Sequence, residues 1–150
     1  TKERIKSLKQ AGVDIFKISI DSPVPEEHDA SRGLKGAFEK AVAAIDFINQ
    51  EKNIFAHMSV ILIPGLFKDG RIYRLIDLAR EKRITLGITM PALIGKWHGK
   101  KILFSSKELM ETKRILKNRF VVTDMDAGYG GKFCPAGKEE LYITCYGDVI

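Results

Sequence analysis

Cysteine is scarce in this chain of 150 residues, which contains two, Cys134 and Cys145. Two cysteines are too few for a disulfide scaffold, and this pair is too widely spaced for a Cys-x-x-Cys metal motif. Low cysteine content is typical of a reducing compartment, so we expect a cytoplasmic protein.

Long apolar runs are also lacking. The longest, near residues 60–63, has the length of a strand and is far too short to cross a bilayer. The first residues, Thr-Lys-Glu-Arg-Ile-Lys, are not followed by an apolar stretch, so no signal peptide is expected. We therefore expect no membrane partner.

The chain has no dense basic segment, although its net charge is +6. Its lysines and arginines are interleaved with acidic residues along expected helices, which indicates a solvated helical exterior. Nucleic-acid binding would call for basic residues gathered around stacking aromatics, so no nucleic-acid partner is expected.

Helical and strand patterns alternate along the chain. Apolar residues recur at helical spacing over residues 2–11, 34–50 and 72–79. Ser105 and Glu108 form a capping box that predicts a helix to about residue 119. Apolar, β-branched runs predict strands over residues 13–20, 54–63, 84–90 and 120–123. Nearly continuous apolar strands between helices predict a parallel α/β sheet, either a barrel or an open doubly wound sheet. No glycine-rich phosphate loop follows any strand, which disfavours a nucleotide-binding version.

The composition changes near the end. Residues 127–137 are rich in glycine, after which Leu141, Ile143 and Cys145 alternate with polar residues up to a turn at Tyr146-Gly147-Asp148. A hairpin whose second strand has two residues is an improbable natural terminus, and the first helix has no strand before it. We therefore expect that the chain is cut at both ends.

Polar residues at the end of the first strand are candidates for a site. Ser19 and Asp21 alternate onto one face, with Lys17 on the same side, at the strand end where parallel folds place their chemistry. The alternative is structural: Asp21 would cap a turn and Ser19 would bond to backbone.

Histidines and a cysteine elsewhere in the chain are further candidates, each with a structural interpretation beside the functional one. The segment with His28, Asp29 and Arg32 is expected to be a solvated loop rather than a metal site, with Arg32 as a possible anion ligand. His57 is expected to be a satisfied core histidine, and His98 to lie in a loop where it could touch a substrate or accompany an anchoring Trp97. Cys134, followed by Pro135, is either a soft-metal ligand or a buried free thiol.

Two sets of motifs resemble those of one family. Ile-Ser-Ile-Asp-Ser, Pro-Glu-Glu-His-Asp-Ala-Ser-Arg-Gly and Gly-Ala-Phe-Glu-Lys-Ala are similar to the middle of radical S-adenosylmethionine enzymes. Cys-Pro-Ala-Gly with Tyr-Gly-Asp-Val-Ile resembles the start of their SPASM extension, which carries an auxiliary iron–sulfur cluster. The resemblance covers almost the whole chain and is weakest around residues 64–104.

The resemblance implies the later part of a partial (β/α)6 TIM-like barrel over residues 1–126 and the beginning of a SPASM-like hairpin region over residues 127–150. Ser19 and Asp21 would contact the ribose and amino-acid part of S-adenosylmethionine. Arg32 would lie near the same ligand, and Met90 with Pro91 would approach the adenine. Cys134 would ligate the auxiliary 4Fe-4S cluster, whereas the role of Cys145 is left open.

The family's Cys-x3-Cys-x2-Cys loop for the catalytic 4Fe-4S cluster does not occur in the sequence. The resemblance therefore implies a fragment, itself inactive, of an enzyme that reductively cleaves S-adenosylmethionine to a 5′-deoxyadenosyl radical. That enzyme would modify a peptide or cofactor precursor and take electrons from a donor such as a flavodoxin or ferredoxin. The alternatives are another (β/α)-barrel lyase or aldolase that uses Lys17 or Asp21, and a basic binding module.

Overall fold

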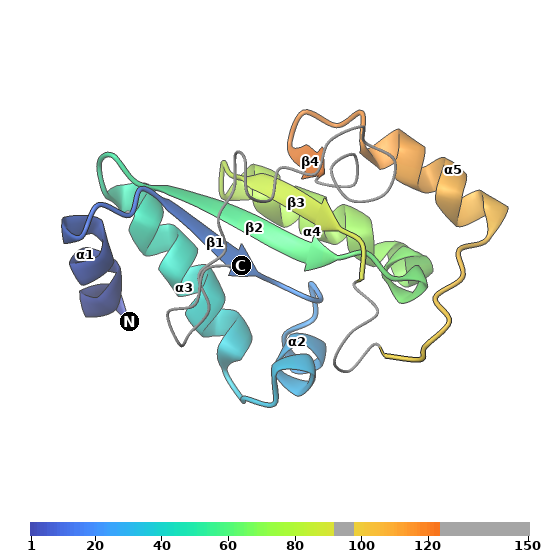
Figure 1. The fold of residues 1–150 in the computed structure, drawn as a ribbon, viewed down its shortest axis with the longest axis horizontal. Coiled ribbons are helices and arrows are strands. Elements are labelled where there is room, and N and C mark those ends of the chain that lie inside the picture. The colour runs from blue at the N-terminus through green and yellow to red at the C-terminus, as the bar shows by residue number, and fades with distance from the viewer. Residues whose placement is uncertain (92–97, 124–150) are drawn as a thin grey trace.

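A computed structural model describes residues 1–91 and 98–123 of the chain (Figure 1). In chain order the elements are α1 (Lys2–Gln10), β1 (Ile15–Ser19), α2 (Pro25–Arg32), α3 (Ala37–Gln50), β2 (Phe55–Ile61), the 3₁₀ segment η1 (Pro64–Gly70), α4 (Arg71–Glu81), β3 (Thr85–Thr89), α5 (Ser106–Ile115) and β4 (Val121–Thr123). None of the helices in this part of the chain combines the length and apolar composition that a membrane span requires.

The four strands form one parallel sheet in the order β1-β2-β3-β4. Each strand pairs with the next along the chain, as repeated strand–helix units produce. The parallel α/β fold expected from the sequence is thus confirmed for the described residues. The partial (β/α)6 barrel stays a prediction, as does the hairpin region over residues 127–150, which lies outside the described residues.

The core lies between one face of the sheet and the helices. Met58 of β2, Leu86 of β3 and Ile20, which directly follows β1, are fully buried together with helix residues of α3 and α4. Figure 1 shows α3 and α4 on the same side of the sheet. The predicted apolar stripe of α4 is confirmed, since all four of its residues are buried: Ile72, Leu75, Ile76 and Ala79.

The opposite face of the sheet is largely polar. Because side chains alternate along a strand, it carries Lys17 and Ser19 of β1, His57 and Ser59 of β2, and the odd-numbered residues of β3. The apolar run over 54–63 indicated a strand buried on both faces, but Phe55 on this second face is 65% exposed.

The segment expected to be a solvated loop is instead helix α2. Pro25 stands in its first turn, where the missing N–H costs nothing, and two glutamates follow where the helix dipole favours negative charge. Gly33, in the left-handed conformation, ends the helix. Consequently α3 begins at Ala37 rather than at residue 34, and Leu34 is exposed.

The capping box is confirmed: the Ser105 side chain accepts from the Glu108 N–H, and the Glu108 carboxylate accepts from the Ser105 N–H. The helix that it opens ends at Ile115, before the expected residue 119, and the chain then turns through residues 116–120 into β4.

Candidate functional site

A cleft of about 420 Å³ opens at the carboxyl ends of β1, β2 and β3. Its walls bring together three of the residues selected from the sequence, namely Ser19, Asp21 and Arg32. The remaining lining residues are Lys17, Ser59, Val60, Ile61 and Thr89. This is the sheet edge at which ligands bind in parallel α/β folds.

Ser19 faces its register partner on β2 across the floor of the cleft. The two hydroxyl oxygens of Ser19 and Ser59 lie 3.2 Å apart, within hydrogen-bonding distance. Ser19 is exposed, whereas Ser59 is 6% exposed. Ser19 lies on the predicted face, beside Asp21 in the lining of the cleft. The structural alternative, a bond from Ser19 to nearby backbone, is not what the structure shows, since the hydroxyl meets a side chain of the neighbouring strand.

Asp21 is held by helix α2, which folds back over the strand end. Its Oδ1 accepts from Nη2 of Arg32 at 2.8 Å, and its Oδ2 accepts from Oγ of Ser31 at 2.7 Å. The Asp21 side chain keeps 22% of its surface exposed and Arg32 keeps 40%. A carboxylate has about four acceptor positions, so Asp21 can take a further hydrogen bond from a ligand.

His28 supports the loop that carries Asp21. The residue is 2% exposed, and its Nδ1 accepts from the Asp21 backbone N–H at 3.1 Å. The ring also meets Phe38 of α3 edge-on, with 5.9 Å between centroids. Burial lowers the pKa of His28; the nearby Asp21 and Asp29 carboxylates oppose this effect and Arg32 adds to it. A ring that accepts at Nδ1 is neutral, so His28 acts as a structural acceptor behind the cleft.

Asp29 joins α2 to the start of α3. Its carboxylate accepts from the backbone N–H groups of Gly36 and Phe38. These backbone hydrogen bonds lower the pKa of Asp29. Asp29 is therefore the N-terminal cap of α3, supplied from the preceding helix, and it is turned away from the cleft.

The structure places Met90 and Pro91 apart from the cleft lining. Met90 packs against the hydrophobic core and Pro91 is buried. Their neighbour Thr89 lines the cleft instead and donates to the Val60 carbonyl at 3.3 Å.

Ser59 and Thr89 are cleft residues that reading the sequence missed. Both could have been selected from the sequence, because each is a hydroxyl residue within an apolar strand. Only the register of the sheet, however, shows that they lie beside Ser19.

The other histidines differ in setting. His57 is satisfied as expected, with Nδ1 2.7 Å from the Thr85 hydroxyl, but it lies half-buried on the polar face rather than in the core. His98 lies exposed in a turn, and its neighbour Trp97 is outside the described residues.

Cys134 and Cys145 also lie outside the described residues. Residues 1–91 and 98–123 contain no cluster of three or more His, Cys, Asp or Glu side chains that could hold a metal ion.

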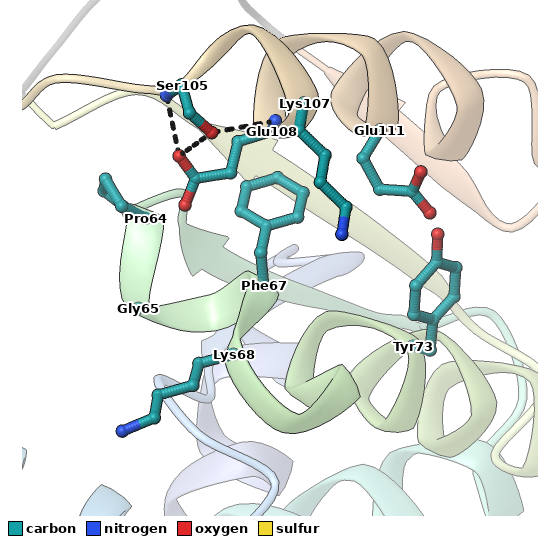
Figure 2. Close-up of a pocket in the computed structure, with 9 residues that line it drawn as sticks. All are labelled: Pro64, Gly65, Phe67, Lys68, Tyr73, Ser105, Lys107, Glu108 and Glu111. Atoms are coloured by element: carbon teal, nitrogen blue, oxygen red, sulfur yellow. Dashed lines mark hydrogen bonds between the residues drawn. The ribbon is translucent and has the colours of Figure 1, made fainter.

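A larger cavity of about 610 Å³ lies among the helices (Figure 2). It is lined by η1, by Tyr73 of α4 and by the beginning of α5, and no strand residue contributes. Figure 2 shows Glu108 turned toward Ser105, where it completes the capping box. None of the residues selected from the sequence for ligand binding lines this cavity.

The sequences of known proteins bear on the enzyme class that the motifs resemble. The chain is 42% identical over 79 residues to an AdoMet-dependent heme synthase of Oleidesulfovibrio alaskensis, a match that covers 51% of this chain and 20% of the relative. It is 40% identical over 81 residues to the protein of the same name from Methanosarcina barkeri, covering 54% and 22% of the two chains. A third, from Nitratidesulfovibrio vulgaris, is 42% identical over 77 residues, covering 51% and 21%.

The chain spans about a fifth of the length of these curated relatives. No family model matches it, and no solved structure does. All three relatives carry the name of an enzyme that depends on AdoMet, that is, S-adenosylmethionine. This agrees with the enzyme class that the motifs around Ser19, Asp21 and Arg32 resemble.

Proposed function

We propose that this chain is part of a radical S-adenosylmethionine enzyme and that the strand-end cleft receives S-adenosylmethionine. The observation that carries the proposal is the convergence of Ser19, Asp21 and Arg32 on one cleft. The sequence similarity to AdoMet-dependent heme synthases also supports the proposal, and it does not depend on the geometry of the cleft.

The polar groups of the cleft suit this ligand. S-adenosylmethionine offers ribose hydroxyls, an ammonium group and a carboxylate. The Asp21 carboxylate can accept from a hydroxyl or the ammonium group, and the Ser19 hydroxyl can donate or accept. The Arg32 guanidinium can bind a carboxylate while it remains beside Asp21. Met90 and Pro91 would contribute through their backbone, because their side chains pack inward.

Bound S-adenosylmethionine would supply the radical chemistry of the enzyme after one-electron reduction by an iron–sulfur cluster. Two cysteines are too few to ligate a 4Fe-4S cluster with the usual set, so the 150 residues by themselves are expected to be inactive. The proposal therefore includes a longer enzyme with a partial (β/α)6 barrel and a SPASM-like region beginning at residue 127. Cys134 would be a ligand of the auxiliary cluster there.

The substrate would be a peptide or a cofactor precursor. The name of the relatives favours a cofactor precursor on the route to heme. Electrons would come from a donor such as a flavodoxin or ferredoxin.

Calorimetric titration of the chain with S-adenosylmethionine tests the cleft directly. Asp21→Ala should weaken binding by about 1–3 kcal/mol, the usual loss for a hydrogen bond to a charged group. Asp14→Ala changes an exposed aspartate just before β1, outside the lining of the cleft, and is the matched control. Circular dichroism is needed in parallel, because Asp21 also binds Arg32 and Ser31. A folded Asp21→Ala protein with unchanged affinity would contradict the proposal.

A further inference from the structure

A second, smaller cleft adjoins the first on the polar face of the sheet. Its volume is about 140 Å³, and its walls include Lys17, His57 and Gly87. Lys17 and Thr89 line both clefts. A ligand that fills the strand-end cleft would therefore border directly on this second space.

The position of the His57 ring depends on a glycine. His57 is level with Thr85 in the sheet, and its Nδ1 lies 2.7 Å from the Thr85 hydroxyl. A Cβ atom placed on Gly87 would come within 2.3 Å of the His57 Nε2. The ring thus extends from the level of Thr85 to that of Gly87, toward the carboxyl end of the sheet.

Gly87 is required here for space rather than for backbone conformation. It is not among the described glycines with a positive φ. A glycine in the middle of a strand weakens it, and commonly marks a place where another group approaches closely. The sequence thus carries a stability cost at residue 87 that lets the His57 imidazole line the cleft.

Lys17 brings positive charge to the same place. It is the register partner of His57 and is exposed. Among the described residues no carboxylate lies within salt-bridge distance of its ammonium group, whereas the charge of Asp21 is balanced by Arg32. An ammonium group to which the described residues supply no acidic partner, next to a fixed imidazole, suits an anion such as a carboxylate or phosphate.

We propose that Lys17 and His57 form an anion-binding subsite that receives a carboxylate or phosphate group of the substrate bound beside S-adenosylmethionine. The assignment to a substrate rests on the proposed function, because that function places S-adenosylmethionine in the adjoining cleft. Binding of an anion by this chain can be measured in the absence of S-adenosylmethionine.

The experiment is a titration of the ¹⁵N,¹³C-labelled chain with inorganic phosphate, followed through the NMR signals of the His57 ring and the Lys17 side chain. We expect a saturable shift of both. Lys17→Met and Gly87→Ala should each weaken phosphate binding about tenfold, as expected when one charged or positioned contact is lost. Gly87→Ala moves the ring without changing any group of the strand-end cleft.

Two matched controls test the location. Lys52→Met removes an exposed lysine outside both clefts, and Gly65→Ala changes a glycine with open space around it. Both should bind phosphate as the unchanged chain does. Absence of a saturable shift, or an equal loss in Lys52→Met, would overturn the proposal. So would an unchanged affinity in Lys17→Met, which stays informative if Gly87→Ala does not fold.

A phosphate titration in the presence of S-adenosylmethionine tests this inference separately from the proposed function. Phosphate should still bind when S-adenosylmethionine is saturating. Displacement of phosphate by S-adenosylmethionine would assign the subsite to that ligand's own carboxylate and overturn the substrate assignment. Phosphate binding in a chain that fails to bind S-adenosylmethionine would refute the proposed function and uphold the anion subsite.

Discussion

The buried imidazole of His28 accepts a hydrogen bond from the backbone N–H of Asp21, with 3.1 Å between Nδ1 and the amide nitrogen. The bond joins helix α2 to the loop that presents the Asp21 carboxylate to the strand-end cleft. The Arg32 and Ser31 side chains, at the C-terminal end of α2, bind the same carboxylate. Helix α2 therefore positions Asp21 through both its backbone and its side chain.

Replacing His28 should loosen this arrangement. His28→Phe keeps the ring but removes the acceptor, and should lower the free energy of unfolding by about 1–2 kcal/mol. His28→Asn should lose less, because the Asn Oδ1 can take the place of Nδ1 as acceptor. Urea denaturation of the two variants measures the difference. If they were equally destabilised, the hydrogen bond would not be what His28 contributes.

The protonation of His28 should make stability depend on pH. Burial holds the pKa of His28 in the folded chain below its ordinary value of 6.5, so the unfolded chain binds more protons between the two values. Its contribution to stability is complete above about pH 6.5 and is lost as the pH falls through the folded pKa. Unfolding measured from about pH 7 to about pH 5 should show this loss, and His28→Asn should reduce it. His98→Asn, in an exposed turn, should leave it unchanged.

The Asp29 cap should respond at lower pH. Hydrogen bonds from the backbone of Phe38 and Gly36 hold the pKa of Asp29 below its ordinary value of 3.8. Stability from this group is present above that value and is lost as the pH falls through the folded pKa. Asp29→Asn should therefore flatten the acid limb of the unfolding curve and destabilise the chain at neutral pH. An acid limb identical to that of Asp14→Asn would show that Asp29 is not a cap.

The capping box of α5 gives a local prediction. Ser105→Ala removes the hydroxyl that accepts from the Glu108 N–H at 3.3 Å and should cost about 1 kcal/mol. Ser106→Ala, one residue into the helix, is the control and should be close to neutral. Amide hydrogen exchange in the first turn of α5 should rise in the first variant alone. Equal exchange in both variants would contradict a role for the box.

The two cysteines should differ within a longer iron-loaded enzyme of the kind proposed. Cys134→Ala should remove the iron and visible absorbance of an auxiliary cluster, because the sequence around Cys134 is rich in glycine and has few apolar residues that could bury a thiol. Cys145→Ala should leave both nearly intact, since Cys145 alternates with Leu141 and Ile143 like a residue of a small apolar layer. Iron analysis of the purified proteins tests this. Equal iron in Cys134→Ala and the unchanged enzyme would remove the SPASM-like region from the proposal.

Patterns within a single element were enough to predict most of the fold. The stripe of α4 and the capping box of α5 are read from neighbours three and four residues apart. Helix α2 was missed because His28 is its only buried residue, so hydrophobic periodicity carries no signal there. Its signals were the proline at the start and the glycine at the end, which act on the backbone rather than through burial.

The candidate site also combines features that a local sequence pattern predicts with features that depend on the tertiary structure. Alternation along β1 places Ser19 and Asp21 on one face from the sequence alone, because the side-chain period of a strand is fixed. The pairing of Ser19 with Ser59 across 40 residues, and the passage of the His57 ring over Gly87, depend on the register between strands. Register is set by how the buried faces of β1, β2 and β3 pack on α3 and α4, and no local pattern encodes it. The sequence thus determined which residues could meet a ligand, and the tertiary structure decided which of them meet each other.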